Sequence, residues 1–218
     1  MISELETPVG LARLHVDAAA EPKAVLLLGH GAGGGIGAAE LVGLARGLPP
    51  RGITVVRFEQ PWVVAGRKTL APPGQLDSAW RAACSALAVQ FPGVALFAGG
   101  RSNGARVACR CFAEPQRGLV LSAFPLHPPG KPERSRVEEL APVAGSALVL
   151  QTESDPFGGA VELQAALSQV GASAAGFVTL AGRSHGPDDR SAAGRARLAE
   201  VLGGICDAVT DFINARLV

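Results

Sequence analysis

Short apolar segments that end in glycine or polar residues recur along the chain. Such a segment is typical of a strand that is buried on both faces. Six of them lie at residues 24–29, 53–59, 94–100, 118–126, 147–153 and 175–182. Residues 11–16 alternate instead, with Ala12, Leu14 and Val16 on one side, as in a half-exposed strand. The pattern therefore predicts seven strands.

Between these strands, apolar residues recur at the spacing of a helix. The clearest stripe consists of Leu76, Trp80, Ala83 and Leu87. Further helices are predicted at residues 36–48, 103–113, 160–170 and 195–217, and the last directs Leu198, Val201, Ile205, Val209 and Phe212 inward. Strands that alternate with helices imply a mostly parallel sheet with helices on both faces. The predicted fold class is α/β.

The chain shows no internal repeat and no break in composition. Its 218 residues suit one domain, and we assign residues 1–218 to a single α/β domain. Two excursions, at residues 61–74 and 127–146, are too short to form a large cap over the sheet. We therefore expect an open site.

Composition and charge exclude several classes of protein. Apolar residues make up 48% of the chain and charged residues 18%, which excludes intrinsic disorder. The net charge is only +1, which argues against a nucleic-acid partner. The longest apolar run, at residues 24–29, is far shorter than the roughly 20 residues of a membrane span. Residues 1–10 have no signal-peptide pattern, so we expect a cytoplasmic protein without a membrane partner.

The cysteines give no sign of a metal site. Cys84, Cys109, Cys111 and Cys206 lack CxxC spacing and have no histidine nearby. We expect free thiols of a reducing compartment, with no metal and no cofactor.

A GxSxG motif follows the apolar segment at 94–99. It reads Gly100-Arg101-Ser102-Asn103-Gly104 and precedes a predicted helix. This context is that of a nucleophile elbow, in which a strained turn between strand and helix exposes the serine hydroxyl. We therefore predict a positive φ at Ser102, which is the candidate nucleophile.

A serine nucleophile needs a base that is oriented by an acid. Asp155 follows the segment at 147–153, and His185 follows the segment at 175–182. The order Ser102, Asp155, His185 is that of α/β-hydrolase triads. Glu153 is an alternative acid and His30 an alternative base. Because Asp155 lies beyond the strand end and His30 lies far ahead of the serine, we assign the triad to Ser102, Asp155 and His185.

The glycine-rich segment Gly29–Gly35 follows another predicted strand. Small residues let the backbone approach a substrate, and a tetrahedral oxyanion needs two N–H donors. We assign these donors to the amides of Ala32 and Asn103. The segment matches neither GxGxxG nor GxxxxGK[ST], which argues against a nucleotide site.

Four residues are candidates for contact with the substrate, namely Gly31, Arg101, Trp62 and Phe157. The two aromatic residues lie just past strand ends, where they either line a site or fill the core. Arg101, with Arg67 and Lys68, either attracts an anionic group or is a solvated charge.

The segments GHGAGGG, GGRSNGARVA, ESDPFG and SHG together resemble the small α/β-hydrolases of the dienelactone-hydrolase-like group. The branch that looks most similar includes a subunit of a chromatin acetylation complex and its testis-expressed relative. The resemblance spans residues 24–213 and implies an α/β-hydrolase fold, the triad of Ser102, Asp155 and His185, and esterase or thioesterase chemistry. Dienelactone hydrolase itself has a cysteine where this chain has Ser102. Relatives also tend to have Asp before the base and Ser after it, where this chain has Ser184 and Gly186.

Two functions of different classes follow. The first is a serine hydrolase that cleaves a small carboxylic ester or thioester through an acyl-enzyme. The second is a noncatalytic interaction domain that retains a hydrolase fold, because a fold alone does not establish activity.

Overall fold

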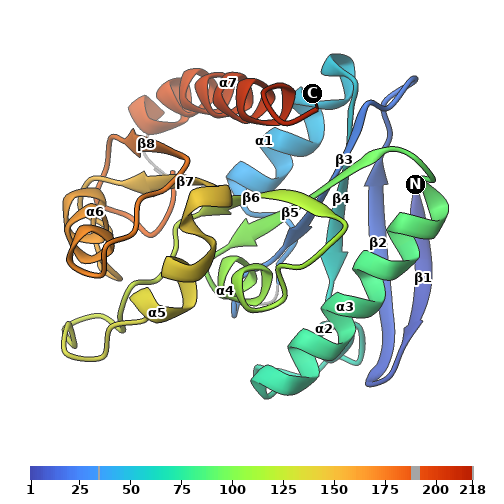
Figure 1. Ribbon diagram of the computed structural model, residues 1–218, viewed down its shortest axis with the longest axis horizontal. Coiled ribbons are helices and arrows are strands. Elements are labelled where there is room, and N and C mark those ends of the chain that lie inside the picture. Colours follow the sequence, from blue (N-terminus) through green and yellow to red (C-terminus); the bar gives the residue numbers. More distant parts are fainter. Residues whose placement is uncertain (34, 188–191, 218) are drawn as a thin grey trace.

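Eight strands form one sheet in the computed structural model, which describes residues 1–33, 35–187 and 192–217 (Figure 1). The strands are β1 (Ile2–Thr7), β2 (Gly10–Asp17), β3 (Ala24–Gly29), β4 (Ile53–Glu59), β5 (Ala95–Arg101), β6 (Gln116–Ser122), β7 (Ala147–Thr152) and β8 (Gly176–Leu180). Their order across the sheet is β1-β2-β4-β3-β5-β6-β7-β8. Strands β3 to β8 run parallel, whereas β2 pairs antiparallel with β1 and β4. The predicted mostly parallel sheet is confirmed.

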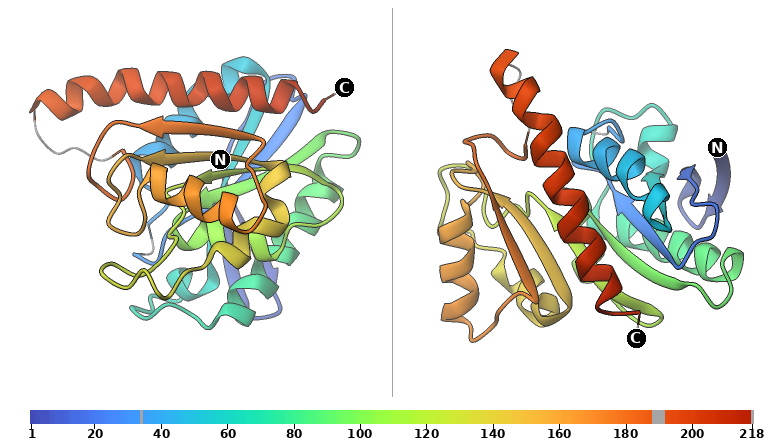
Figure 2. Two further views of the ribbon diagram at one scale, coloured as in Figure 1. Left: turned by 60° about the vertical axis from the view of Figure 1, so that its left-hand side comes forward. Right: turned by 90° about the horizontal axis from the view of Figure 1, so that it is seen from above.

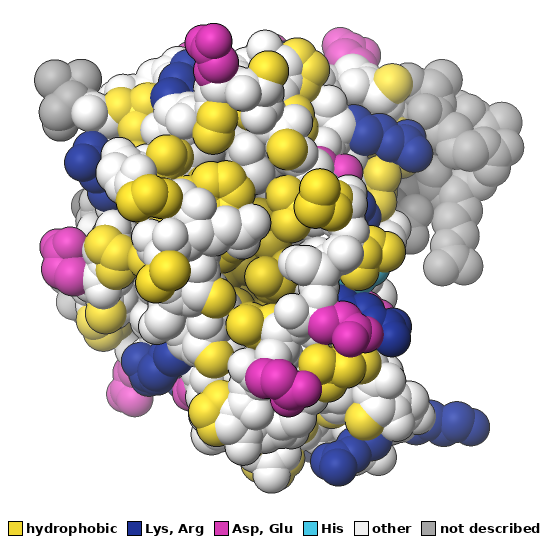
Figure 3. Space-filling view, turned by 90° about the vertical axis from the view of Figure 1, so that its right-hand side faces the viewer, with side chains coloured by type: hydrophobic (Ala, Val, Ile, Leu, Met, Phe, Trp, Pro, Cys, Tyr) yellow, Lys and Arg dark blue, Asp and Glu magenta, His cyan; other side chains and the backbone are white. Residues whose placement is uncertain are grey.

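Strand β1 lies outside the seven predicted strands. Its alternation breaks at Ile2, which lies on the exposed side with Glu4, whereas Ser3 and Leu5 lie on the half-buried side. Ile2 is 62% exposed, so hydrophobic burial does not define this strand. The strand is defined instead by its antiparallel pairing with β2, in which Leu5 lies opposite Ala12. Figure 3, which views this side of the molecule, shows hydrophobic side chains over the middle of the face and charged ones mainly toward its margins.

Helices cover both faces of the sheet. On one face lie α1 (Ala39–Gly47) and α7 (Ala192–Asn214), and Figure 2 shows α7 running across the sheet beside α1. The other face carries α2 (Pro61–Val64), α3 (Pro73–Gln90), α4 (Asn103–Arg110), α5 (Val137–Leu140) and α6 (Ala160–Gln169). Two short 3₁₀ helices, η1 (Pro49–Arg51) and η2 (Ala141–Ser146), complete the elements. Among the described residues, no helix is long and apolar enough to cross a membrane.

The predicted helical stripes match the buried positions closely. In α3, the residues of the predicted stripe are all buried, with Trp80 fully so. In α7, Ile205, Val209 and Phe212 are buried, but Leu198 and Val201 are only half-buried. The start of α7 projects past the edge of the sheet in Figure 2.

The predicted strand at 118–126 is wrong at its carboxyl end. Strand β6 stops at Ser122, because the next residue, Ala123, has a φ of 47°. That conformation turns the chain out of the sheet. The residues that follow, as far as α5, form the short excursion over this edge, and no large cap stands over the part of the sheet that the structure describes.

The sheet reverses its direction of growth at β3. The chain passes from β3 to β4 on one side and then to β5 on the other side. Such a reversal leaves a crevice at the carboxyl ends of the two central strands. Gly29 at the end of β3 is in register with Gly100 near the end of β5. The glycine-rich segment after β3 and the serine after β5 therefore lie next to each other, at the carboxyl ends of the two central strands.

Candidate active site

Ser102 occupies a sharp turn between β5 and α4. Its backbone has φ 53° and ψ −116°, which confirms the predicted positive φ. The amide of Ser102 donates a hydrogen bond to the carbonyl of Ser122 at 3.0 Å, which ties the turn to the neighbouring strand β6. A non-glycine residue adopts this conformation at a cost of roughly 1–3 kcal/mol, and such strain is concentrated at functional sites.

The glycines of the motif are required by close packing against β3. A Cβ built on Gly104 would lie 2.4 Å from the carbonyl carbon and oxygen of Gly29. A Cβ on Gly100, where φ is 152°, would lie 2.5 Å from the same oxygen. Real Cβ atoms do not approach backbone atoms so closely, so the spacing GxSxG allows the turn to pass beside β3.

Gly104→Ala is expected to destabilise the protein by about 1–3 kcal/mol, because the added methyl group forces backbone apart. The matched control is Gly203→Ala on α7, where a Cβ would meet nothing within 4 Å. Alanine at this exposed helical position should instead stabilise by about 0.5–1 kcal/mol. Urea denaturation of both variants measures the difference. Equal stabilities would contradict the packing argument.

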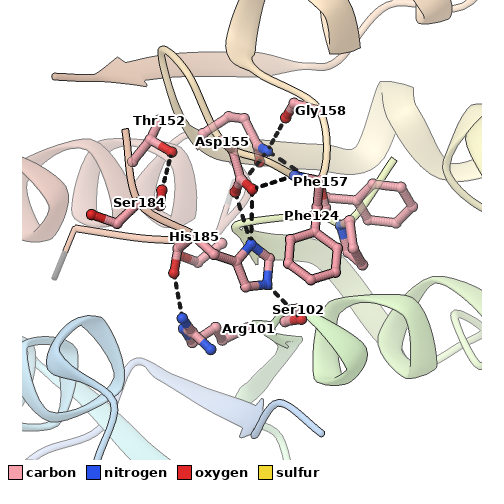
Figure 4. A network of polar contacts seen from close by, with 12 residues as sticks. Arg101, Ser102, Phe124, Thr152, Asp155, Phe157, Gly158, Ser184 and His185 are labelled. Atoms are coloured by element: carbon pink, nitrogen blue, oxygen red, sulfur yellow. Dashed lines mark hydrogen bonds and ion pairs between the residues drawn. The ribbon is translucent and has the colours of Figure 1, made fainter. Parts of the chain in front are cut away.

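The side chains of Ser102, His185 and Asp155 lie in a row (Figure 4). His185 Nε2 is 2.7 Å from Ser102 Oγ. His185 Nδ1 is 2.8 Å from Asp155 Oδ2 and 3.1 Å from Oδ1. Both contacts lie within hydrogen-bonding reach. The Nδ1 proton is donated to the carboxylate, which leaves Nε2 free to accept the proton of the serine hydroxyl.

Asp155 is held by hydrogen bonds from its own loop and from the end of β7. The amide of Phe157 donates to Asp155 Oδ1 at 2.8 Å, and Gln151 Nε2 lies 3.4 Å from Oδ2. The Asp155 residue is buried, with 5% exposure. Glu153, the alternative acid, is exposed. Of the two carboxylates, Asp155 is therefore the one that the fold directs at His185.

The loop that carries His185 has no regular secondary structure over residues 181–187. Thr152 Oγ1 donates to the carbonyl of Ser184 at 2.7 Å, and Arg101 donates to the carbonyl of His185. The ring of Phe157 packs against the imidazole, with centroids 4.3 Å apart. Phe157 thus lies beside the proposed base.

The glycine-rich segment passes directly beside Ser102. A Cβ on Gly31 would lie 3.5 Å from Ser102 Cβ, which is van der Waals contact. Ala32 follows and is exposed, while Asn103 is the first residue of α4. The amide of Asn103 is thus among the helix N-terminal N–H groups that have no intrahelical acceptor. Of the two predicted donors, Asn103 directly follows Ser102 and Ala32 follows Gly31, while Gly34 of the same segment lies outside the described residues.

His30 has a structural role. Its Nδ1 donates to the carbonyl of Gly31 at 2.8 Å, and its Nε2 accepts from the amide of Gln60 at 3.2 Å. Both ring nitrogens are therefore engaged by the backbone, and the imidazole is neutral. Burial lowers the pKa of His30, against the smaller opposing effects of the Gly31 carbonyl and the charge of Glu59. His30 shapes the loop and is not placed to deprotonate Ser102.

Because the pKa of His30 is lowered in the folded protein, the free energy of unfolding should decrease as the pH falls. Below the ordinary value of 6.5, the unfolded chain binds a proton at His30 more readily than the folded chain does. Stability from this residue should therefore fall as the pH drops from 7.5 to 5.5, by up to about 1 kcal/mol. His30→Gln removes the titration, so urea denaturation of both proteins across this range isolates it. Parallel profiles would contradict the assignment of a neutral buried imidazole.

Trp62 is buried and packs near His30, with ring centroids 5.8 Å apart. It also lines a cavity of about 300 Å³ beside the β1–β2 turn and α2. Trp62 lies in α2, which follows β4 at the carboxyl edge of the sheet. Arg67 and Lys68 are exposed and lie in solvent.

Arg101 is engaged with protein groups. Besides the His185 carbonyl, its guanidinium contacts Glu40, with Nε 2.7 Å from Oε1. Sequence reasoning missed Glu40, because an acidic residue in the first turn of a helix is ordinarily a solvated one. It also missed Thr152 and Gln151, which sit at the end of an apolar strand and show no motif.

The cysteines are free and buried. Burial raises the pKa of Cys84 to about 12 and that of Cys111 to about 11, so both are thiols at neutral pH. Among the side chains that the structure describes, no three of the types His, Cys, Asp and Glu come together as metal ligands.

A family model described as an alpha/beta hydrolase domain matches residues 22–214. No curated protein matches the chain. Among solved structures, a serine hydrolase homologue from Coxiella burnetii is 17% identical, with a TM-score of 0.77 over 96% of this chain and 97% of that chain.

Two further structures have similar coverage. An alpha/beta serine hydrolase without lid from Xanthomonas campestris is 22% identical, with a TM-score of 0.75 over 97% of this chain and 94% of that chain. A thermostable carboxyl esterase from Bacillus coagulans is 12% identical, with a TM-score of 0.71 over 100% of this chain and 99% of that chain. At these identities the likeness concerns the fold, and it confirms the predicted fold class.

Proposed function

The chain belongs to the alpha/beta-hydrolase family, and we propose that it is a serine hydrolase that cleaves a small carboxylic ester or thioester. The observation that carries this proposal is the continuous row of hydrogen bonds from Ser102 through His185 to buried Asp155. Its members come from three separate strand ends, and their distances suit proton transfer.

In the proposed mechanism, Ser102 Oγ attacks the carbonyl carbon of the substrate while His185 Nε2 takes the hydroxyl proton. Asp155 holds the Nδ1 proton, so the imidazole presents its basic nitrogen to Ser102 and its positive charge is stabilised as it forms. The imidazolium then protonates the leaving alcohol or thiol, and the acyl group remains on Ser102. Water, deprotonated by His185, attacks the acyl-enzyme and releases the acid.

The tetrahedral intermediate carries a negative charge on the former carbonyl oxygen. We assign its donors to the amides of Ala32 and Asn103, on the two backbone segments that border Ser102. Asn103 lies at the N-terminus of α4, where the helix dipole favours negative charge. Donors that are fixed before reaction stabilise this charge without reorganisation.

Substrate size and charge follow from the surroundings of Ser102. The absence of a large cap over the described part of the sheet suits a small or extended ester. The charge of Arg101 is paired with Glu40, so a neutral acyl group fits better than an anionic one. The carboxyl esterase among the structural neighbours supports ester cleavage. Membership of the dienelactone-hydrolase-like branch is part of the proposal and rests on the sequence segments alone.

A fluorophosphonate probe tests the proposal without knowledge of the substrate. The probe phosphonylates a serine whose hydroxyl is activated by a base. Wild-type protein should be labelled at Ser102, and prior heat denaturation should prevent labelling. If folded wild-type protein is not labelled, the hydrolase proposal is wrong and a noncatalytic interaction domain becomes the better account.

A further inference from the structure

Arg101 connects the loop of the base to a buried carboxylate. Its Nη2 donates to the main-chain carbonyl of His185, and its Nε lies 2.7 Å from Glu40 Oε1 (Figure 4 shows the first contact). The Glu40 side chain is 2% exposed, whereas that of Arg101 is 23% exposed. Ser122 Oγ adds a weaker hydrogen bond to Glu40 Oε1 at 3.4 Å. The pair therefore joins α1, the end of β5 and the end of β6 to the loop of residues 181–187.

The pair also contacts the segments on either side of Ser102. A Cβ on Gly31 would lie 3.2 Å from Arg101 Nη1. A Cβ on Gly186, where φ is 97°, would lie 3.2 Å from Glu40 Oε1 and 3.4 Å from Arg101 Nε. Both glycines thus let the backbone pack onto the pair. The guanidinium lies against the segment that carries the proposed oxyanion donor and against the loop that carries the base.

The burial of Glu40 fixes the guanidinium in place. An ionised carboxylate without a partner is strongly disfavoured in a buried site, so Glu40 requires the positive charge of Arg101. The guanidinium is planar and carries its donors in a rigid fork. The contact of Nε with Glu40 is an ion pair without the alignment of a hydrogen bond, and the hydrogen bond that Nη2 donates to the carbonyl of His185 sets the direction of the fork. A surface arginine would have no such constraint.

We propose that Arg101 and Glu40 act as positioning residues, which hold the main chain of His185 so that its ring stays in line between Ser102 and Asp155. This inference rests on the proposed hydrolase function and adds two residues to it. The loop of His185 lacks regular secondary structure, so it depends on side chains for its position. A displacement of about 1 Å in a catalytic group can lower a rate about 10²-fold.

The test compares two arginines of similar exposure, each paired with a carboxylate. Arg101→Gln removes the guanidinium beside the base. The control is Arg110→Gln, because Arg110 Nη2 lies 2.6 Å from Asp77 Oδ1 and its side chain is 21% exposed. We expect Arg101→Gln to lower kcat for p-nitrophenyl acetate and the rate of fluorophosphonate labelling by about 10- to 10²-fold, with little change in KM. Arg110→Gln should lose stability but keep both rates.

A second measurement reports the base directly. We expect the proton between His185 Nδ1 and Asp155 to give a downfield resonance in the proton NMR spectrum of the folded protein. Arg101→Gln should broaden or shift this resonance, and Arg110→Gln should leave it unchanged. Methylguanidinium at millimolar concentration should restore part of the labelling rate of Arg101→Ala, because it can occupy the space of the missing group beside Glu40.

The double variant Glu40→Gln with Arg101→Gln removes both charges and leaves no unpaired buried charge. It therefore controls for a loss of activity that is caused only by unfolding. If this folded double variant labels as fast as wild type, the inference is overturned while the proposed function stands. The same holds if Arg101→Gln slows labelling no more than Arg110→Gln does. Wild-type protein that does not label at all would remove the proposed function, and the inference with it.

Discussion

Ser102→Ala is expected to reduce the hydrolysis of a short activated ester by a factor on the order of 10⁶, which is the loss that follows removal of a triad serine or histidine. His185→Ala should cause a similar loss. The reason is the 2.7 Å contact between Ser102 Oγ and His185 Nε2, since neither the nucleophile nor its base acts without the other. Steady-state hydrolysis of p-nitrophenyl acetate and p-nitrophenyl butyrate measures both variants.

The double variant Ser102→Ala with His185→Ala shows whether the serine and the histidine act as one catalytic unit or contribute independently to the rate. Residues that act as a unit give losses that are far from additive, so the double variant should be little worse than either single variant. Circular dichroism provides the control for folding. If Ser102→Ala retained most of the turnover, hydrolysis would come from another group on the surface, and the proposed role of Ser102 would be wrong.

Asp155→Asn is expected to lower kcat by about 10⁴-fold. The amide can donate to Nδ1 and so favour the tautomer that carries its proton on Nε2, which cannot accept the proton of Ser102. The fold and the KM should change little, because asparagine has nearly the same shape. Kinetics on short esters measure this loss.

Glu153→Gln is the matched control, since Glu153 lies two residues before Asp155 but is exposed. It should leave kcat within about twofold of wild type, as a surface substitution away from the site does. A large loss in Glu153→Gln together with a small loss in Asp155→Asn would reverse the assignment of the acid.

The strands and the triad were accessible from local sequence for a definite reason. Parallel strands are buried on both faces, so their sequences are continuously apolar and end in polar or glycine residues. Because chemistry in such sheets gathers at the carboxyl ends, the residues after three of these segments pointed to Ser102, Asp155 and His185. The GxSxG spacing carried its own steric reason, which the contact between Gly104 and Gly29 makes explicit.

Strand β1 and the contacts of Arg101 depend on neighbours that are distant along the chain. In β1 the alternation breaks at Ile2, and only pairing with β2 makes it a strand. Arg101 meets Glu40 and His185 across separations of 61 and 84 residues, and no local pattern encodes such a contact. The sequence around a charged residue at a strand end does not show whether its side chain is solvated or buried against a carboxylate.

The chain by itself thus determined the fold class, the elbow and the three residues of the proposed triad, because backbone sterics and burial act through near neighbours in sequence. The tertiary structure decided which groups hold them. In the tertiary structure His30 binds the backbone of its own loop and of Gln60, Asp155 accepts the amide of Phe157, and Arg101 lies against Glu40. These choices depend on burial and on distances between separate strand ends, which exist only after the sheet has brought those ends together.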